Sequence, residues 1–213
     1  MTVDNSDSDS DRSSRLTIEQ TVGLEANNQG CSYYVKNGFN QDYDKAASYF
    51  KLATDYGNSA GQYNLGFLYQ VGKGVIKDIV QAFRWHKLSA DQGDSDAQFS
   101  LGNMYRYGKG VTQDINECLR YYKLAAEQGN TSAQFSLGLM YDCGLGVKRD
   151  YNESAIWWQK AAEQGCSNAQ YCLGRMYRYG HGVKQDAKEA FKWFKLAAEQ
   201  GDSTAQSYLA MLH

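Results

Sequence analysis

Residues Asp94 to Gly129 read DSDAQFSLGNMYRYGKGVTQDINECLRYYKLAAEQG, and the same pattern occurs three more times in the chain. The other full copies span residues 58–93, 130–165 and 166–201. Gly93 and Gly129 close consecutive copies 36 residues apart, and no insertion or deletion interrupts this period. A fixed period of this size is typical of a repeat protein, in which each copy is one supersecondary unit that packs on its neighbours.

Each copy predicts two helices, of which the first covers residues 95–107 in the quoted copy. Ala97, Leu101 and Met104 keep the spacing of one helix face there. Gly102 lies in the middle of this helix and has a counterpart in every full copy. A glycine inside a helix costs about 1 kcal/mol relative to alanine. We therefore expect a neighbouring helix to approach the chain closely at this position.

A Gly-x-Gly-Val turn and then an aspartate separate the two helices. The turns are Gly72–Val75, Gly108–Val111, Gly144–Val147 and Gly180–Val183. The first glycine of each turn suits a left-handed C-cap. The aspartates, which are Asp78, Asp114, Asp150 and Asp186, are placed to cap the second helix. In that second helix, large aromatics alternate with small residues, as at Trp85 and Ala90, which predicts interlocked antiparallel helices.

The pattern AQxxLGxxYxxGxGVxxDxxxAxxWxxxAAxxG resembles the Sel-1-like repeat (SLR), a relative of the tetratricopeptide repeat. The resemblance covers the four full copies and partial copies at each end, and Cys118, Tyr121 and Ser154 are mild departures from it. It implies an all-α fold, namely a right-handed superhelical α/α solenoid of 36-residue helix-turn-helix repeats.

The two ends of the chain differ from the full copies. Residues 1–16 are rich in serine and aspartate, which predicts a disordered acidic tail. This tail is either solubilising or a phosphorylation tract, since Ser6 and Ser8 each have an aspartate three residues on. The predicted solenoid covers residues 17–213. It begins with a degenerate copy at 22–57, for which Thr17 and Gln20 could form a capping box. It ends with a partial copy at 202–213, either a terminal cap or the start of a longer array.

Composition and charge exclude several classes of function. The 213 residues contain 22 Lys plus Arg against 24 Asp plus Glu, a net charge of −2. RNA-binding helical repeats need a basic stripe, so we expect no nucleic-acid partner. No apolar run reaches the length of a membrane span, and the N-terminus lacks the pattern of a signal peptide.

The cysteines favour reduced thiols. Cys31, Cys118, Cys143, Cys166 and Cys172 fall at five different places in the repeat. An odd and scattered count predicts a cytoplasmic protein without disulfides. Some bacterial SLR proteins carry two bridged cysteines per repeat and have been linked to β-lactam binding and hydrolysis. Here paired alanines, such as Ala125 and Ala126, carry no such cysteines.

No pattern in the sequence predicts a catalytic group, a cofactor or a metal. His86 takes the aromatic position that Tyr122, Trp158 and Phe194 hold in other copies, which predicts a packed or half-exposed ring. Cys166 and Cys172 are six residues apart, off the helical register of a metal pair. The Gly-Lys-Gly turns follow a helix and lack the spacing of a phosphate-binding loop.

The resemblance implies a non-enzymatic scaffold or adaptor that brings other proteins together. A regulatory subunit or activator of one enzyme is the alternative. A hydrolase on the same fold is a third reading, and the missing cysteines and acid/base group count against it.

A comparison of the first helices predicts where a partner binds. One face repeats in every copy, whereas a second face differs, at positions spaced i, i+4, i+7 and i+11. In stacked helix pairs the first helices line the concave surface, so we expect a groove there for an extended peptide or a partner helix. The predicted binding residues are Phe67, Asn103, Tyr107, Leu139, Arg175 and Tyr179. Simple drift of exposed positions is the alternative, but aromatics and arginine are common interface anchors.

Overall fold

The computed structural model describes residues 6–35 and 41–210, with side chains from residue 17 onward. All regular structure in this part of the chain is helical, with eleven α-helices and no strand. The chain divides into two compact units, unit 1 at residues 1–113 and unit 2 at residues 114–213. The predicted all-α repeat solenoid is confirmed at this level, because helices alternate with the turns that the sequence pattern predicts.

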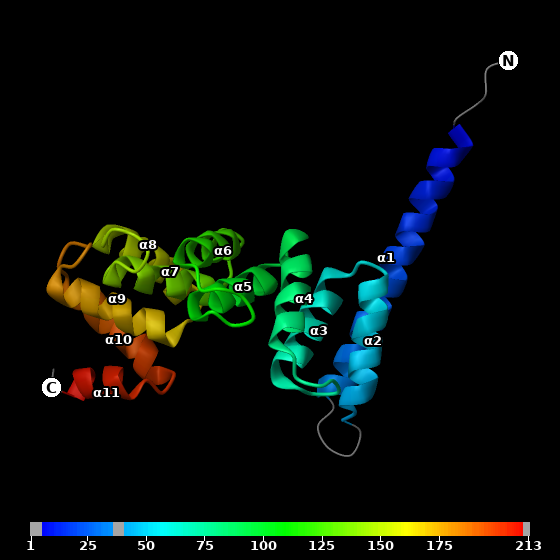
Figure 1. Cartoon of the computed structure of the whole chain (residues 1–213). Coiled ribbons are helices and arrows are strands. Elements are labelled where there is room, and N and C mark those ends of the chain that lie inside the picture. The colour runs from blue at the N-terminus through cyan, green and yellow to red at the C-terminus, as the bar shows by residue number, and fades with distance from the viewer. Residues whose placement is uncertain (1–5, 36–40, 211–213) are drawn as a thin grey trace. The chain divides into compact units, whose positions relative to one another are not determined.

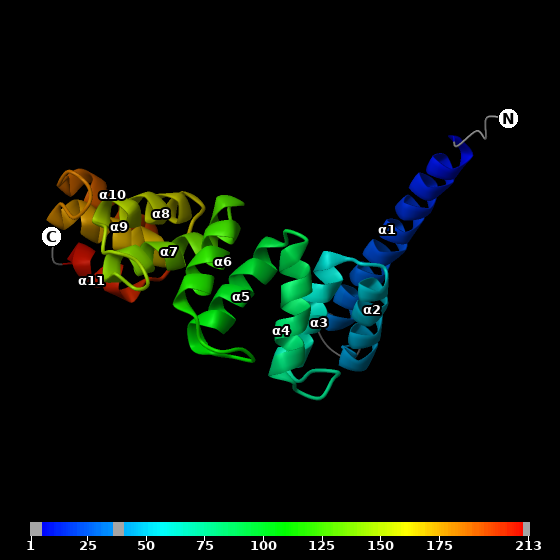
Figure 2. The ribbon, with the colours of Figure 1, turned by 45° about the horizontal axis from the view of Figure 1, so that its top comes forward.

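Consecutive helices in each unit lie side by side (Figure 1, Figure 2). Unit 1 contains α1 (Ser6–Val35), α2 (Tyr43–Asp55), α3 (Ser59–Val71), α4 (Ile79–Asp91) and α5 (Ser95–Tyr107). Unit 2 contains α6 (Ile115–Glu127), α7 (Thr131–Cys143), α8 (Tyr151–Glu163), α9 (Ser167–Tyr179), α10 (Ala187–Glu199) and α11 (Ser203–Ala210). Helices α3, α5, α7 and α9 are the first helices of the full copies, and α4, α6, α8 and α10 are the second helices.

The turn between the two helices of a copy forms as predicted. Helix α5 ends at Gly108, whose φ of 63° is left-handed, and the Gly108 N–H donates to the carbonyl of Met104. A residue with a Cβ is strained at this φ, which is why glycine stands here. At the other side of a turn, an Asp150 carboxylate oxygen accepts from the backbone N–H groups of Asn152 (2.9 Å) and Glu153 (3.1 Å). Asp78, Asp114 and Asp186 cap their helices in the same way.

The second glycine of each turn joins neighbouring copies. A Cβ on Gly110 would overlap the carbonyl oxygen of Ile79, and a Cβ on Gly182 would overlap that of Tyr151. Ile79 and Tyr151 are the first residues of α4 and α8, the second helices of the preceding copies. These two turns therefore pack directly on backbone, which the sequence pattern did not predict.

In α3, α7 and α9, the glycine inside the first helix is a contact site for an aromatic ring of the second helix, in line with the close approach that the sequence predicts. A Cβ on Gly174 would lie 2.8 Å from the Phe194 ring, and one on Gly66 would lie 3.0 Å from the His86 ring. Gly138 is in the same relation to Trp158. Real Cβ atoms rarely approach other atoms this closely, so each ring occupies the volume of the missing side chain. The contact compensates for the helix propensity that glycine loses.

Buried glutamines connect the copies through hydrogen bonds. The Gln134 amide N–H donates to the carbonyl of Ala126 on the preceding second helix (3.1 Å). Its amide oxygen accepts from the side chain of Gln164 (2.7 Å). The equivalent pairs are Gln62 with Gln92 and Gln170 with Gln200. In these three copies the Gln of the closing Gln-Gly therefore satisfies a buried polar group, which would cost about 1–3 kcal/mol if it were left unpaired.

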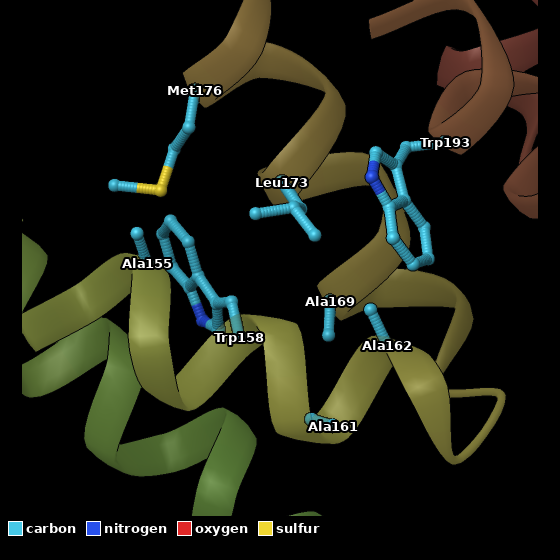
Figure 3. Close-up of a cluster of buried hydrophobic side chains, with 8 residues drawn as sticks. All are labelled: Ala155, Trp158, Ala161, Ala162, Ala169, Leu173, Met176 and Trp193. Carbon is cyan, nitrogen blue, oxygen red and sulfur yellow. The ribbon is translucent and has the colours of Figure 1, made fainter. Parts of the chain in front are cut away.

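The apolar core of unit 2 lies between its helices. Figure 3 shows Trp158 and Ala155 on α8 facing Leu173 and Met176 on α9, and Trp193 of α10 beside Ala162 and Ala169. Small residues face large ones across each contact, as the alternation in the second helices predicts. Burial of this kind is the main favourable contribution to folding.

The capping box predicted at Thr17 and Gln20 is wrong. Both residues lie inside α1, and the Thr17 carbonyl accepts from the Thr21 hydroxyl within the helix (2.8 Å). Thr17 therefore has helical neighbours on both sides and cannot serve as an N-cap. The predicted disordered tail at residues 1–16 includes the first turns of α1 and residues outside the described part of the chain, and it stays a prediction.

Candidate functional site

In α3, the variable face serves packing between first helices. Asn64 donates its side-chain N–H to the Asn27 side chain of α1 (2.9 Å). The half-buried Phe67 ring packs edge-on against the ring of Tyr34, with 6.1 Å between centroids. Phe67, a predicted binding residue, therefore contributes to the contact between α1 and α3. Only part of its ring is available to a partner.

In α5, two predicted residues come together. Asn103 and Tyr107 line the same cavity of about 240 Å³, whose other walls include Gln70 and Lys109. Tyr107 is 57% exposed, although it is a large aromatic residue. The Arg106 guanidinium lies 5.3 Å and the Lys109 ammonium 5.5 Å from the centre of its ring. The arrangement presents an aromatic face with positive charge around it.

In α7, the predicted residue Leu139 is half-buried. It packs against the core that contains Leu173 and Met176. The variable position Ser136 is also buried, and its hydroxyl donates to the carbonyl of Ser132 in the same helix (2.8 Å). The variable face of α7 therefore offers less exposed surface than that of α5.

In α9, both predicted residues are exposed. Arg175 is exposed, and Tyr179 is 48% exposed, with its hydroxyl 3.4 Å from the hydroxyl of Tyr208 in α11. This hydrogen bond and the nearby Arg178 lower the pKa of Tyr179. The Arg178 guanidinium lies 5.7 Å from the Tyr179 ring and 5.2 Å from that of Tyr208. Tyr179 also lines a cavity of about 580 Å³ together with Phe191.

We call the exposed part of these faces the first-helix surface, defined by Asn103 and Tyr107 in unit 1 and by Arg175 and Tyr179 in unit 2. In each unit it combines a half-exposed tyrosine with arginine from the same helix. Rings and guanidinium groups suit binding, because they bury large areas and form hydrogen bonds at a low entropic cost.

His86 is a packing residue. Its side chain is 1% exposed, its ring lies 5.4 Å from the Tyr63 ring, and burial lowers its pKa to about 4. Among the described residues, neither ring nitrogen has a hydrogen-bond partner. The imidazole is therefore neutral at pH 7 and fills the place that Trp158 and Phe194 fill in other copies. The predicted packed ring is confirmed.

Burial makes two of the thiols poor nucleophiles. Burial raises the pKa of the Cys172 thiol to about 12 and also raises that of Cys31. A thiol at neutral pH is a poor nucleophile, because the thiolate is the reactive form. No disulfide joins cysteines in the described part of the chain. Residues 17–35 and 41–210 contain no group of three or more metal-ligating side chains. None of the described helices combines the length and apolar composition of a membrane span.

Comparisons with known proteins identify the repeat. A family model described as "Sel1 repeat" matches five consecutive stretches, residues 30–58, 59–94, 95–130, 131–166 and 167–202. The four later matches follow the 36-residue period, and the first overlaps the predicted degenerate copy. No protein with a curated description matches the sequence.

Solved structures show the same fold. A Sel1 repeat protein from Oxalobacter formigenes is 35% identical, with a TM-score of 0.83 over 89% of this chain and 78% of that one. A protective antigen of uropathogenic Escherichia coli with an SLR fold is 39% identical, with a TM-score of 0.82 over 88% of this chain. This chain spans 40% of the length of that antigen. An immunity protein from Pseudomonas aeruginosa, 22% identical with a TM-score of 0.57, covers 86% of this chain and 67% of its own.

Proposed function

The chain belongs to the Sel1 repeat family, whose members are generally non-catalytic protein-interaction scaffolds, and on this premise we propose that it binds a partner polypeptide through its first-helix surface. The exposure of Tyr107 carries this proposal. A tyrosine 57% exposed beside a cavity contributes little to the stability of unit 1. The same ring buried under a partner would contribute strongly to affinity.

The charges around the two tyrosines specify the chemistry of the partner. Arg106 and Lys109 lie near the Tyr107 ring, and Arg175 and Arg178 lie near Tyr179. An extended peptide or a helix with carboxylates beside apolar side chains complements each place taken by itself, because the ring receives the apolar groups and the cations pair with the carboxylates. The partner is thus a protein segment of mixed acidic and apolar character.

The experiment compares Tyr107→Ala and Tyr179→Ala with wild type, using the partner captured by pull-down from the native cell. We expect each substitution to weaken binding by about tenfold or more, the usual effect of truncating an aromatic interface anchor. Leu88→Ala is the matched control, since Leu88 is 48% exposed on a second helix. Circular dichroism checks the fold. Unchanged affinity of both tyrosine variants would place the binding site elsewhere on the molecule.

A further inference from the structure

A third cavity lies outside the first-helix surface, on the second helix α8. It has a volume of about 530 Å³. One face of α8 forms one wall, with Asn152, Ala155, Ile156 and Gln159 at the i, i+3, i+4 and i+7 positions. The opposite wall includes Tyr177 of α9 and Val183 of the following turn.

The equivalent place between α4 and α5 in unit 1 is filled by a phenyl ring. Phe83 packs edge-on against Tyr105, with ring centroids 5.6 Å apart and an interplanar angle of 84°. Phe83 and Tyr105 occupy the same repeat positions as Ala155 and Tyr177, two copies earlier. Where α4 has a phenyl group, α8 has a methyl group, and the volume beside Tyr177 is left open. The cavity therefore has room for an aromatic side chain beside Tyr177.

Helix α8 differs from the other second helices at three more positions on this face. Where α8 has Gln159 and Lys160, the other four copies have lysine and then leucine: Lys51 and Leu52, Lys87 and Leu88, Lys123 and Leu124, and Lys195 and Leu196. Ile156, 49% exposed, replaces Arg84, Arg120 and Lys192, and Ser48 in the first copy. Ala47 of that copy is the one other alanine at the position of Ala155, but its helix keeps the common lysine and leucine.

These differences make the face more apolar and move its positive charge to a new position. At the cavity rim, the exposed Ile156 replaces a charged side chain of three other copies. The neutral Gln159 replaces their lysine, and the cationic Lys160 replaces their leucine. The Lys160 side chain lines the cavity, and its ammonium lies 4.3 Å from the centre of the Trp157 ring. The result is an apolar cavity with amide side chains and one positive charge at its rim.

We propose that this cavity binds an aromatic side chain of a partner polypeptide that carries a carboxylate next to the ring. The ring would lie beside Tyr177, as Phe83 lies beside Tyr105, and the carboxylate would pair with Lys160. Asn152 has a donor and an acceptor for a peptide backbone, and Gln159, whose side-chain N–H already donates to Glu163, has its amide oxygen as an acceptor. The site goes beyond the proposed function, because it lies on a second helix and does not involve Tyr107 or Tyr179.

The test is a titration of the isotope-labelled full chain followed by NMR, with N-acetyl-Phe-Glu-amide as the probe. Saturable shifts are expected at the backbone signals of Ala155, Tyr177 and Val183. Replacing the probe by N-acetyl-Ala-Glu-amide is expected to weaken binding by about tenfold or more, because the phenyl ring supplies the buried apolar area. N-acetyl-Phe-Gln-amide tests the carboxylate and is expected to bind more weakly to wild type.

Two variants sharpen the test. Ala155→Phe fills the cavity from within, as Phe83 does in unit 1, and is expected to abolish binding of the probe. Lys160→Leu restores the residue of the other copies and is expected to remove the preference for Phe-Glu over Phe-Gln. Phe83→Ala opens the equivalent place beside Tyr105 and is expected to add a site for the ring.

Equal binding to wild type and Ala155→Phe would overturn the proposal, as would the absence of shifts around Tyr177. If toluene bound as tightly as the dipeptide, the cavity would instead be a site for small apolar molecules, and the proposal would be wrong. The first-helix surface is judged separately. Ala155→Phe is expected to leave the effect of Tyr107→Ala on the captured partner unchanged, so that either site can fail without the other.

Discussion

Helices α4 and α8 occupy the same position in two copies of the repeat, one in each unit, and they keep the same packing contact on one face but not on the other. The inner face places a flat ring on a glycine in both, His86 on Gly66 and Trp158 on Gly138. On the outer face, α4 has Phe83 against Tyr105, whereas α8 has Ala155 and an open cavity.

The difference shows which constraints the repeat imposes. The inner position requires a ring of suitable shape and accepts an imidazole with no hydrogen bond, because the glycine provides a fixed space. The outer position has no such requirement, so its residue can change from phenyl to methyl while the helix keeps its length and caps. Surfaces that differ between copies are therefore the places to look for binding.

The largest effect is expected on the inner face. Trp158 is 4% exposed, and Trp158→Ala removes both its ring and the contact with Gly138. We expect a loss of about 3–5 kcal/mol in the free energy of unfolding, measured by denaturant titration and circular dichroism. Ile156→Ala, on the exposed side of the same helix, is the control and is expected to stay within about 0.5 kcal/mol of wild type. Similar losses for both variants would contradict the division into two faces.

The pH dependence of stability tests the buried imidazole. Because burial lowers the pKa of His86 from 6.5 to about 4, the unfolded chain takes up its proton at a higher pH than the folded one. This contribution to stability is complete above pH 6.5 and is lost as the pH falls toward 4, by about 3 kcal/mol at most.

His86→Phe is the matched variant, since Phe194 fills the same position in another copy. It is expected to reduce the loss of stability between pH 6.5 and 4, because the other titrating groups are unchanged. Parallel curves of stability against pH for the variant and wild type would show that His86 is not buried as a neutral ring.

A smaller effect is expected on the outer face. Phe83→Ala is expected to cost about 1–2 kcal/mol, since the residue is half-buried and its edge-on pair with Tyr105 is worth about 0.5–1.5 kcal/mol. Ala155→Phe is expected to stabilise the chain by up to about 1 kcal/mol through the same contact with Tyr177. Denaturant titration of both variants measures the difference. Destabilisation by Ala155→Phe would show that the cavity does not have the shape of the Phe83 site.

The smallest effect is expected from a reductant, which should leave the melting temperature unchanged. If the thiols are reduced, as the scattered cysteines predict, the melting temperature is the same with and without a reductant. We propose on this basis that the protein works in a reducing compartment. A marked drop on reduction would reveal a disulfide, because the loss of one costs about 2–5 kcal/mol.

Much of the fold could be predicted from local sequence, because each helix, turn and capping signal involves only a few neighbouring residues. The helix at residues 95–107, the left-handed cap at Gly108 and the cap at Asp150 all formed as predicted. The capping box at Thr17 failed. A pattern of two residues does not show whether a helix continues upstream of it.

The candidate site was less predictable, because exposure depends on partners in other copies. The sequence places Phe67 and Tyr107 on the same variable face of their helices, yet Phe67 packs on Tyr34, 33 residues earlier, whereas Tyr107 is exposed. The cavity at α8 had a signal in the sequence, namely the substitution of Ala155 for Phe83. A comparison restricted to first helices does not include that position. Its volume could come only from the structure.

The most direct test of partner binding at the first-helix surface is site-specific crosslinking in the native cell. A photoreactive phenylalanine replaces Tyr107 in one variant of the full chain and Leu88, exposed on the second helix α4, in another. The proposed function predicts one partner polypeptide crosslinked from position 107 and absent from position 88. Crosslinks from position 88 alone would contradict it.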